Sequence, residues 1–293
     1  MRLGIAPHRL WPDRDGDLEG VLETARTAER LGFDHVIAGS HVLRTGLGAT
    51  LDPIVLLSAV AGATSRIRIA TSVLIAPLYQ PVILAHQTAS LDFLSGGRFV
   101  LGVGTGWDAA EFSAVGVPFG QRGRRTDENL ATMKALWQEE FTEARIGVSP
   151  LTPGGPPVWV GGDSDAALRR ALCFGDAWHG SGNPAAMAGV RRRIADLAES
   201  IGRDPATLAL TSVAFLVPPG VRQIGRVPVS PLGGTRPSAG SVVEELGQLK
   251  AAGVTTCSLW LPVSAAALPD ALAWIAEQVM PSLDAGSSRP SPL

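Results

Sequence analysis

The chain has 293 residues, and 45% of them are hydrophobic, which is enough to bury one large core. Barrels of this length commonly form a single domain, so we expect one domain over residues 1–280. The 25 basic and 27 acidic residues are scattered and leave a formal net charge of −2, which argues against a nucleic-acid partner. Residues 281–293, rich in Ser and Pro, indicate a disordered tail.

The two cysteines, Cys173 and Cys257, stand in separate segments without Cys-x-x-Cys or Cys/His spacing. This argues against a disulfide framework and a structural zinc site. Metal-binding motifs such as His-x-His and His-Glu-x-x-His are absent from the sequence, so no metal is expected. The N-terminal apolar run is too short for a signal peptide, and no segment approaches the roughly 20 apolar residues of a membrane span. We therefore expect a cytoplasmic protein without a membrane partner.

Short β-branched runs alternate with segments that carry apolar residues at helical spacing, about every 35 residues. This alternation is typical of parallel strands joined by crossover helices. The predicted strands are residues 2–6, 35–38, 67–73, 99–103, 157–161, 177–179, 208–217 and 255–261. The predicted helices are residues 18–31, 53–63, 81–94, 126–139, 165–174, 185–201, 241–252 and 265–280. Strand–helix units in this number favour an α/β fold of the (β/α)8 TIM-barrel class over a doubly wound sheet.

Two stretches interrupt the alternation and are predicted to be loops, residues 141–156 and 218–240. The second follows the seventh predicted strand and contains several Pro and Gly residues. In a (β/α)8 barrel this insertion would lie on the catalytic face and could act as a lid. A floppy insertion is the alternative.

Active sites of such barrels lie where strands end and in the loops that follow. The second strand runs into Ser40 and His41. An imidazole at the barrel mouth can donate or accept a proton near neutral pH, which makes His41 the catalytic candidate. The alternative is a histidine that only satisfies a local backbone carbonyl. His179, at the end of the sixth strand, is a weaker second candidate.

The fourth strand ends in alternate glycines, since residues 102–107 read Gly-Val-Gly-Thr-Gly-Trp. Gly104 and Gly106 would let the backbone approach a ligand closely, and Trp107 would offer it a flat apolar wall. Packing of Trp107 in the core is the alternative. The run does not match the dinucleotide fingerprint, because it follows a fourth strand and lacks the immediate helix and final glycine spacing.

The fifth strand leads through Gly161, Gly162, Asp163 and Ser164 into a predicted helix. Exposed backbone N–H groups, the positive end of the helix dipole and a hydroxyl suit a phosphate group. A plain capped turn is the alternative, since Asp163 or Ser164 caps a helix well by itself, and the charge of Asp163 counts slightly against phosphate. We favour the phosphate interpretation, because barrel phosphate sites often use this arrangement.

Several stretches over residues 1 to about 180 carry a more specific pattern. They are residues 28–34 (Ala-Glu-Arg-Leu-Gly-Phe-Asp), 64–71 (Thr-Ser-Arg-Ile-Arg-Ile-Ala-Thr), 91–99 (Leu-Asp-Phe-Leu-Ser-Gly-Gly-Arg-Phe), 101–107, 118–119, 122–123, 157–162 (Pro-Val-Trp-Val-Gly-Gly) and 175–178. In content and order they resemble the bacterial luciferase-like monooxygenase family, in particular its coenzyme F420-dependent (deazaflavin) branch. Beyond residue 180 the resemblance rests mainly on barrel periodicity.

The resemblance implies a luciferase-like (β/α)8 barrel with the cofactor ring at its mouth, backed by a bulge at the end of the third strand. In the deazaflavin enzymes this bulge is a non-prolyl cis peptide, which carries over here to Ser72 and Val73. The mouth histidine of the family carries over to His41. In this picture the cofactor carries the hydride, His41 handles a proton and Trp107 lines the substrate pocket.

The family's phosphate-binding turn carries over to Gly161, Gly162 and Ser164. Two positions depart from the family. Ser40 stands where many relatives have an acid before the histidine. Trp107 stands where the deazaflavin-dependent sugar-phosphate dehydrogenases have a catalytic acid, so that activity is not predicted. The segment between the fourth predicted helix and the fifth strand is also shorter than usual.

The leading hypothesis is an F420-dependent oxidoreductase that moves a hydride between deazaflavin and a small organic substrate. An FMN-dependent monooxygenase that uses O2 keeps the same fold and is the first alternative. A non-catalytic flavin- or deazaflavin-binding protein, suggested by Ser40 and the shortened segment, is the second. Many relatives form dimers, so a homodimer is expected.

Overall fold

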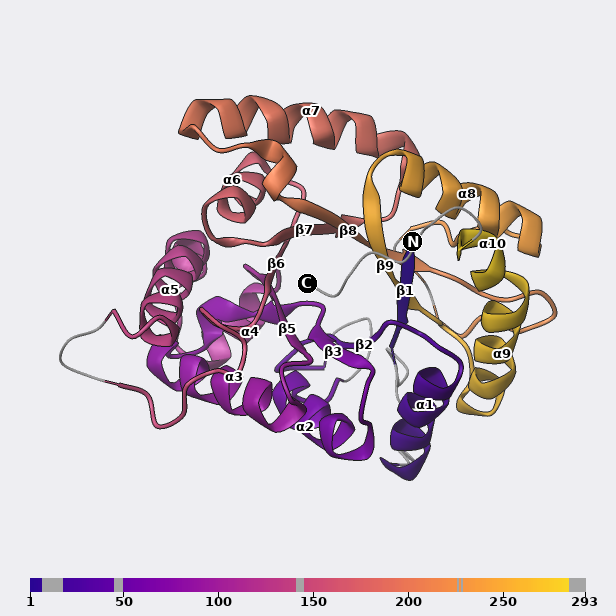
Figure 1. Cartoon of the computed structure of the whole chain (residues 1–293), viewed down its shortest axis with the longest axis horizontal. Helices are drawn as coiled ribbons and strands as arrows, with labels where there is room; N and C mark the ends of the chain where they lie inside the picture. The colour runs from indigo at the N-terminus through magenta and orange to yellow at the C-terminus, as the bar shows by residue number, and fades with distance from the viewer. Residues whose placement is uncertain (7–17, 45–49, 141–144, 226, 228, 285–293) are drawn as a thin grey trace.

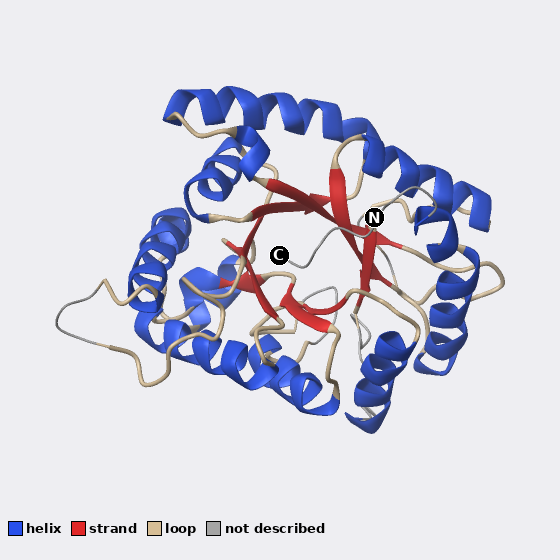
Figure 2. Cartoon of the chain, viewed as in Figure 1, coloured by secondary structure: helices blue, strands red, loops and turns tan. Residues whose placement is uncertain are grey.

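The computed structural model describes residues 1–6, 18–44, 50–140, 145–225, 227 and 229–284. Parallel strands pair in the order β3-β2-β1-β9-β8-β7-β6-β5-β4, and a further pairing between β3 and β5 closes the sheet. The helices surround this closed sheet (Figure 1; Figure 2). The predicted (β/α)8 TIM barrel is confirmed.

The strands are β1 (Arg2–Ile5), β2 (His35–Ala38), β3 (Arg68–Thr71), β4 (Leu74–Ile75), β5 (Phe99–Gly104), β6 (Val158–Gly161), β7 (Ala177–Ser181), β8 (Ala209–Phe215) and β9 (Val254–Trp260). The α-helices are α1 (Leu18–Arg30), α2 (Pro53–Ala63), α3 (Pro81–Ser95), α4 (Ala109–Ala114), α5 (Arg122–Trp137), α6 (Asp165–Phe174), α7 (Pro184–Ile201), α8 (Ala239–Ala251), α9 (Leu268–Gln278) and α10 (Met280–Asp284). Short 3-10 turns cover Ala76–Leu78, Phe119–Gln121, Pro205–Thr207 and Ala265–Ala267. The segments β3 and β4 together form the third barrel strand.

The structure departs from the predicted elements in three places. The third strand is interrupted between β3 and β4, and the short helix α4 was not predicted. Residues 281–284, predicted to belong to a disordered tail, lie in α10, where Leu283 is buried and its carbonyl accepts a hydrogen bond of 2.9 Å from Lys250 Nζ. Residues 285–293 lie outside the described residues, so the rest of the tail stays a prediction.

The insertion at 218–240 follows β8, the seventh barrel strand, and is tied to the C-terminal ends of two strands. The backbone N–H of Leu232 donates to Phe215 at the end of β8 (2.8 Å), and that of Ile224 donates to Pro262 just after β9 (2.7 Å). Leu232 is itself buried. The segment is therefore anchored at the catalytic end of the barrel, and its action as a lid stays a prediction.

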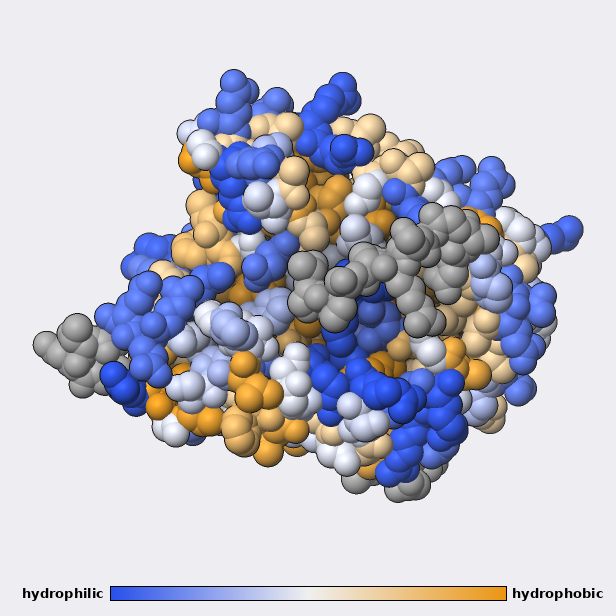
Figure 3. Space-filling model, viewed as in Figure 1, coloured by the Kyte–Doolittle hydropathy of each residue, from blue (hydrophilic) through white to orange (hydrophobic). Residues whose placement is uncertain are grey.

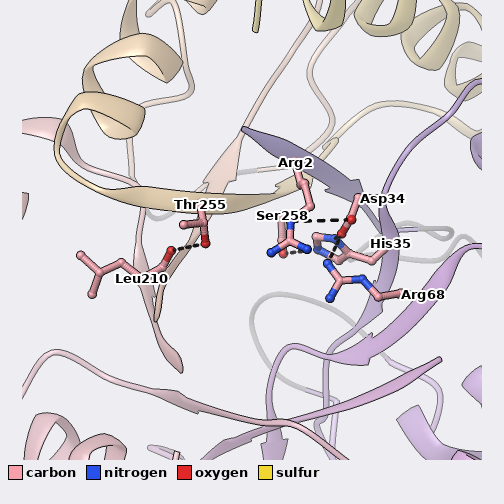
Figure 4. Close-up of polar contacts among 7 residues, drawn as sticks. All are labelled: Arg2, Asp34, His35, Arg68, Leu210, Thr255 and Ser258. Carbon is pink, nitrogen blue, oxygen red and sulfur yellow. Dashed lines mark hydrogen bonds and ion pairs between the residues drawn. The ribbon is translucent and has the colours of Figure 1, made fainter. Parts of the chain in front are cut away.

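A buried polar cluster fills the N-terminal end of the barrel (Figure 4). His35 is fully buried, with Nδ1 2.8 Å from Asp34 Oδ2 and Nε2 2.7 Å from Ser258 Oγ. Arg68 also donates to Asp34. Gly4 lies opposite His35 in register, and a Cβ at this glycine would overlap the imidazole ring. The glycine therefore allows a histidine to occupy the barrel interior.

Candidate functional site

The third barrel strand breaks at the mouth, where the Ser72-Val73 peptide bond is cis. Val73 packs between the neighbouring strands β5 and β6: a Cβ at Gly104 would lie 2.6 Å from Val73 Cγ2, and one at Gly161 would lie 3.0 Å from Val73 Cγ1. The bulge therefore rests on two glycines that the sequence assigned to cofactor binding. The predicted cis peptide at this position is confirmed.

The alternate glycines Gly102 and Gly104 of β5, and Gly106 just after it, face alternate residues of the third barrel strand. A Cβ at Gly102 would overlap the carbonyl oxygen of Thr71, and one at Gly106, whose φ is +74°, would lie 2.7 Å from Ile75 Cγ2. Gly104 stands between them against the bulge. The sequence analysis predicted that these glycines let the backbone approach a ligand. In the structure, their lack of a side chain leaves room for the neighbouring strand.

A series of hydrogen-bonded side chains inside the barrel holds Ser72. The hydroxyl of Thr211 donates to the Trp178 carbonyl (3.0 Å), so it accepts from His179 Nδ1 (2.7 Å). Nε2 of His179 is then left to accept from Ser72 Oγ (2.9 Å). Burial lowers the pKa of His179 to about 3, so this ring stays neutral. His179 is 3% exposed, and its role is to support the bulge.

The ring of Trp159 packs against the histidine of this hydrogen-bonded series. Trp159 stacks on His179, with ring centroids 5.0 Å apart and planes 29° from parallel. The other side of Trp159 meets His35 edge-on at 5.5 Å. The rings of these residues fill the barrel between the polar cluster at one end and the mouth at the other.

His41 and Trp107 lie together at the mouth, as predicted. The Trp107 ring meets the His41 ring edge-to-face, with centroids 5.5 Å apart and planes at 70°. Trp107 is 60% exposed, so its alternative role as a core residue is wrong. The side chain of His41 is 16% exposed, so part of it remains accessible beside the indole.

A carboxylate that the sequence analysis did not identify contacts His41. Glu111 on α4 is fully buried, and its Oε2 lies 3.1 Å from His41 Nδ1. Its Oε1 accepts from the backbone N–H groups of Val42 (2.5 Å) and Leu43 (3.2 Å). The alternative prediction was that His41 only satisfies a local backbone carbonyl. The structure shows its Nδ1 at a carboxylate instead. Asp108, three residues before Glu111, has the spacing of a helix start and is the signal that could have located α4.

Ser40 turns to a different network. It is buried near Tyr79, whose hydroxyl donates to Asp52 Oδ2 (3.2 Å). Burial and then the nearby Asp52 charge raise the pKa of Tyr79, so the phenol stays protonated. The acid that contacts His41 is Glu111, which reaches it from another element.

The turn after β6 combines an exposed backbone with a cation. Gly162 has a φ of +118°, and the exposed Ser164 accepts from Ala167 N (3.2 Å) to cap α6. Arg193 of α7 donates to the carbonyl of Asp163 (2.7 Å). The helix cap expected from the alternative interpretation is present. Arg193 lies too far along the chain for sequence spacing to associate it with this turn.

The described part of the chain also bears on metal binding and on membrane insertion. Among those residues, no three or more His, Cys, Asp and Glu side chains group as metal ligands would. Within the same residues, no helix has both the length and the apolar character that crossing a bilayer requires.

Comparisons with known proteins extend this picture. A family model described as luciferase-like monooxygenase matches residues 3–218. An uncharacterized protein of Mycobacterium tuberculosis (strain ATCC 25618 / H37Rv) is 33% identical over 184 residues, 59% of this chain and 64% of that protein. The FMNH(2)-dependent dimethylsulfone monooxygenase of Pseudomonas putida is 24% identical over 229 residues, 73% of this chain and 62% of that protein. The matches thus span less than two thirds of these curated relatives.

A solved structure shares the fold over nearly the whole chain. The coenzyme F420-dependent tetrahydromethanopterin reductase from Methanopyrus kandleri superposes with a TM-score of 0.76 at 17% identity. The superposition covers 96% of this chain and 98% of that chain.

Proposed function

Because the chain belongs to the luciferase-like monooxygenase family, we propose that it is a coenzyme F420-dependent oxidoreductase that acts on a small organic substrate. The choice of F420 follows the resemblance of the sequence to the deazaflavin branch, and the observation that supports a ring site is the contact of His41 with the exposed Trp107 at the mouth. FMN is the alternative cofactor, favoured by the FMNH(2)-dependent relative, and it would make the chain a monooxygenase that uses O2. A cytoplasmic location remains an expectation from the sequence.

The residues at the mouth fit a planar ring with an anionic tail. Half-buried Val73, supported by glycines, provides a firm apolar surface, and exposed Trp107 provides a second one. The tail would meet the backbone at Gly162, the hydroxyl of Ser164 and the start of α6, with Arg193 as a nearby cation. The exposed Asp163 is the unfavourable charge, and Arg193, which donates to its carbonyl, is itself paired with Asp165 (2.6 Å).

The chain's own residues would then perform three tasks. When bound, the cofactor would supply or accept the hydride. His41 would hold or release a proton at its ring, and Trp107 would exclude water from the same corner and orient the substrate. Ser72, fixed by its bond to buried His179, would keep the bulge in place behind the ring.

The test titrates purified protein with F420 and with FMN and assays turnover on a panel of alcohols, ketones and enones. We expect preference for F420, and we expect His41→Asn to keep F420 affinity while turnover falls at least about 100-fold, the usual contribution of a general acid or base. His86→Asn on the exposed face of α3 is the matched control and should match the wild type. Preference for FMN with oxygen uptake would establish the alternative. Tight binding without any turnover would favour a non-catalytic binding protein.

We also propose a homodimer formed through α2 and α3. These helices pack against each other and expose Val55 on α2 together with Val82, Ile83 and Leu94 on α3, which are 52–70% exposed. Apolar residues gather over α3 at the lower edge of Figure 3. Large exposed apolar patches mark interaction surfaces, and the resemblance implies that the partner is a second copy.

The double variant Ile83→Asp/Leu94→Asp is expected to sediment as a monomer while the wild type sediments as a dimer, because two buried charges in a subunit interface would have no partner. Sedimentation velocity measures this directly. Ile201→Asp, a similar change on α7, is the control and should stay dimeric. A monomeric wild type would refute the dimer, and a dimeric double variant would place the interface elsewhere.

A further inference from the structure

Glu111 has two oxygens with different tasks. Oε1 accepts from the backbone N–H groups of Val42 and Leu43, which hold the chain just after His41. Oε2 faces His41 Nδ1 at 3.1 Å. The carboxylate is fully buried, so water does not compete for these three contacts. The contact with the imidazole is therefore not required to tie down the loop, because Oε1 already does so.

The direction of the hydrogen bond at Oε2 follows from the chemistry of the two groups. An ionised carboxylate has only acceptors, so His41 Nδ1 must be the donor. A neutral imidazole carries one proton, which leaves Nε2 as an acceptor. Among the residues that the structure describes, no hydrogen bond engages that nitrogen.

We propose that Glu111 is a positioning residue that fixes His41 in the Nδ1–H tautomer, so that Nε2 takes up a proton at the barrel mouth. The tautomer stands on the contacts above, whereas its use in catalysis rests on the proposed function. A carboxylate behind a catalytic imidazole controls tautomer and orientation in the same way in other enzymes. The sequence gives His41 no acidic neighbour, since position 40 is a serine, and α4 supplies the acid from elsewhere.

The substitution Glu111→Gln tests the tautomer because the two ends of an amide are not equivalent. Val42 and Leu43 both donate, so the amide oxygen must take the place of Oε1. The amide NH2 then takes the place of Oε2 and donates to His41 Nδ1. The variant keeps the size of the side chain and the loop contacts, yet it forces the ring into the Nε2–H tautomer.

The experiment records long-range ¹⁵N–¹H spectra of the cofactor-free protein with ¹⁵N-labelled histidine at pH 9, where imidazoles are neutral. His41→Asn identifies the His41 signals. We expect Nδ1–H in the wild type and Nε2–H in Glu111→Gln. Asp108→Asn, which removes the charge at the start of the same helix α4 but keeps a capping oxygen, is the control and should keep Nδ1–H. The proposal would be overturned if His41 carried its proton on Nε2 in the wild type, or if the wild type and Glu111→Gln showed the same tautomer. The wild-type spectrum decides even if the variant does not fold.

A second readout uses turnover with F420 and whichever alcohol, ketone or enone the enzyme converts. Glu111→Gln is expected to lower kcat by roughly 100-fold to 10,000-fold, and to cause little further loss in a His41→Asn background, because both changes remove the same proton transfer. Additive losses would show that Glu111 acts apart from His41. Because the spectra need no cofactor, a failure of the F420 assignment leaves the tautomer result intact, and the two failures are distinguishable.

Discussion

Lowering the pH from 7 to 4.5 is expected to reduce the free energy of unfolding by about 2.5 kcal/mol through His179 alone. Burial lowers the pKa of this histidine to about 3 in the folded protein, against about 6.5 in an unfolded chain. Between these values the unfolded chain binds a proton that the folded protein refuses. Stability is therefore complete above pH 6.5 and is lost as the pH falls toward the folded pKa.

The cluster at the other end of the barrel acts in the same direction (Figure 4). Burial also lowers the pKa of His35, so this ring adds to the loss below pH 6.5. Burial opposes the charge of Asp34, but the hydrogen bond from His35 and the charge of Arg68 outweigh it and lower the pKa of the carboxyl. A carboxyl with a lowered pKa contributes stability above its unfolded value of about 3.9 and loses it at lower pH. The contribution of Asp34 is thus lost last.

Urea unfolding between pH 8 and pH 4.5 measures this dependence. In His179→Gln the free energy of unfolding is expected to depend less steeply on pH below 6.5, because glutamine does not titrate. This variant is expected to be less stable than the wild type at pH 8, because the hydrogen bond to Ser72 changes. His86→Gln removes an exposed histidine and should leave the slope unchanged. Equal slopes in the two variants would show that His179 is protonated in the folded protein.

The sequence was enough to predict the barrel because each strand and helix carries a local signal. The predicted bounds of β2, α2 and α6 agree with the structure. Helix α4 escaped because six residues are too few for a periodic apolar pattern. Its detection would have identified Glu111, the carboxylate that contacts His41.

The sequence predicted which residues of the candidate site lie at the barrel mouth. It did not predict as well the direction in which each side chain points. His41 and Trp107 were each predicted at the mouth, and the structure shows that their rings are in contact there. His179 was predicted to end the sixth strand, but it lies inside β7, and its side chain turns into the barrel and bonds to Ser72 and Thr211. Because side chains alternate between the two faces of a strand, an error of one residue decides whether a side chain points into the barrel or away from it. Strand ends predicted from sequence are not accurate to one residue.

The glycines of β5 lead to the second large expected effect. Gly102→Ala is expected to destabilise the protein by at least about 3 kcal/mol, the upper range of overpacking costs, because the new Cβ would overlap the Thr71 carbonyl oxygen. This oxygen belongs to the backbone of β3, so no flexible side chain can move aside. The same two residues are also joined by a hydrogen bond of 2.6 Å from Thr71 Oγ1 to Gly102 O, which further limits separation of the strands.

Urea midpoints for Gly102→Ala and Gly62→Ala measure the effect. Gly62 lies in α2 with nothing within 4 Å of a new Cβ, so its change to alanine should stabilise the helix by about 0.5–1 kcal/mol. A Gly102→Ala protein as stable as the wild type would mean that β3 and β5 can separate without cost. The bulge at Ser72-Val73 follows β3 directly, so such freedom would also remove the structural basis for a firm surface behind the cofactor ring.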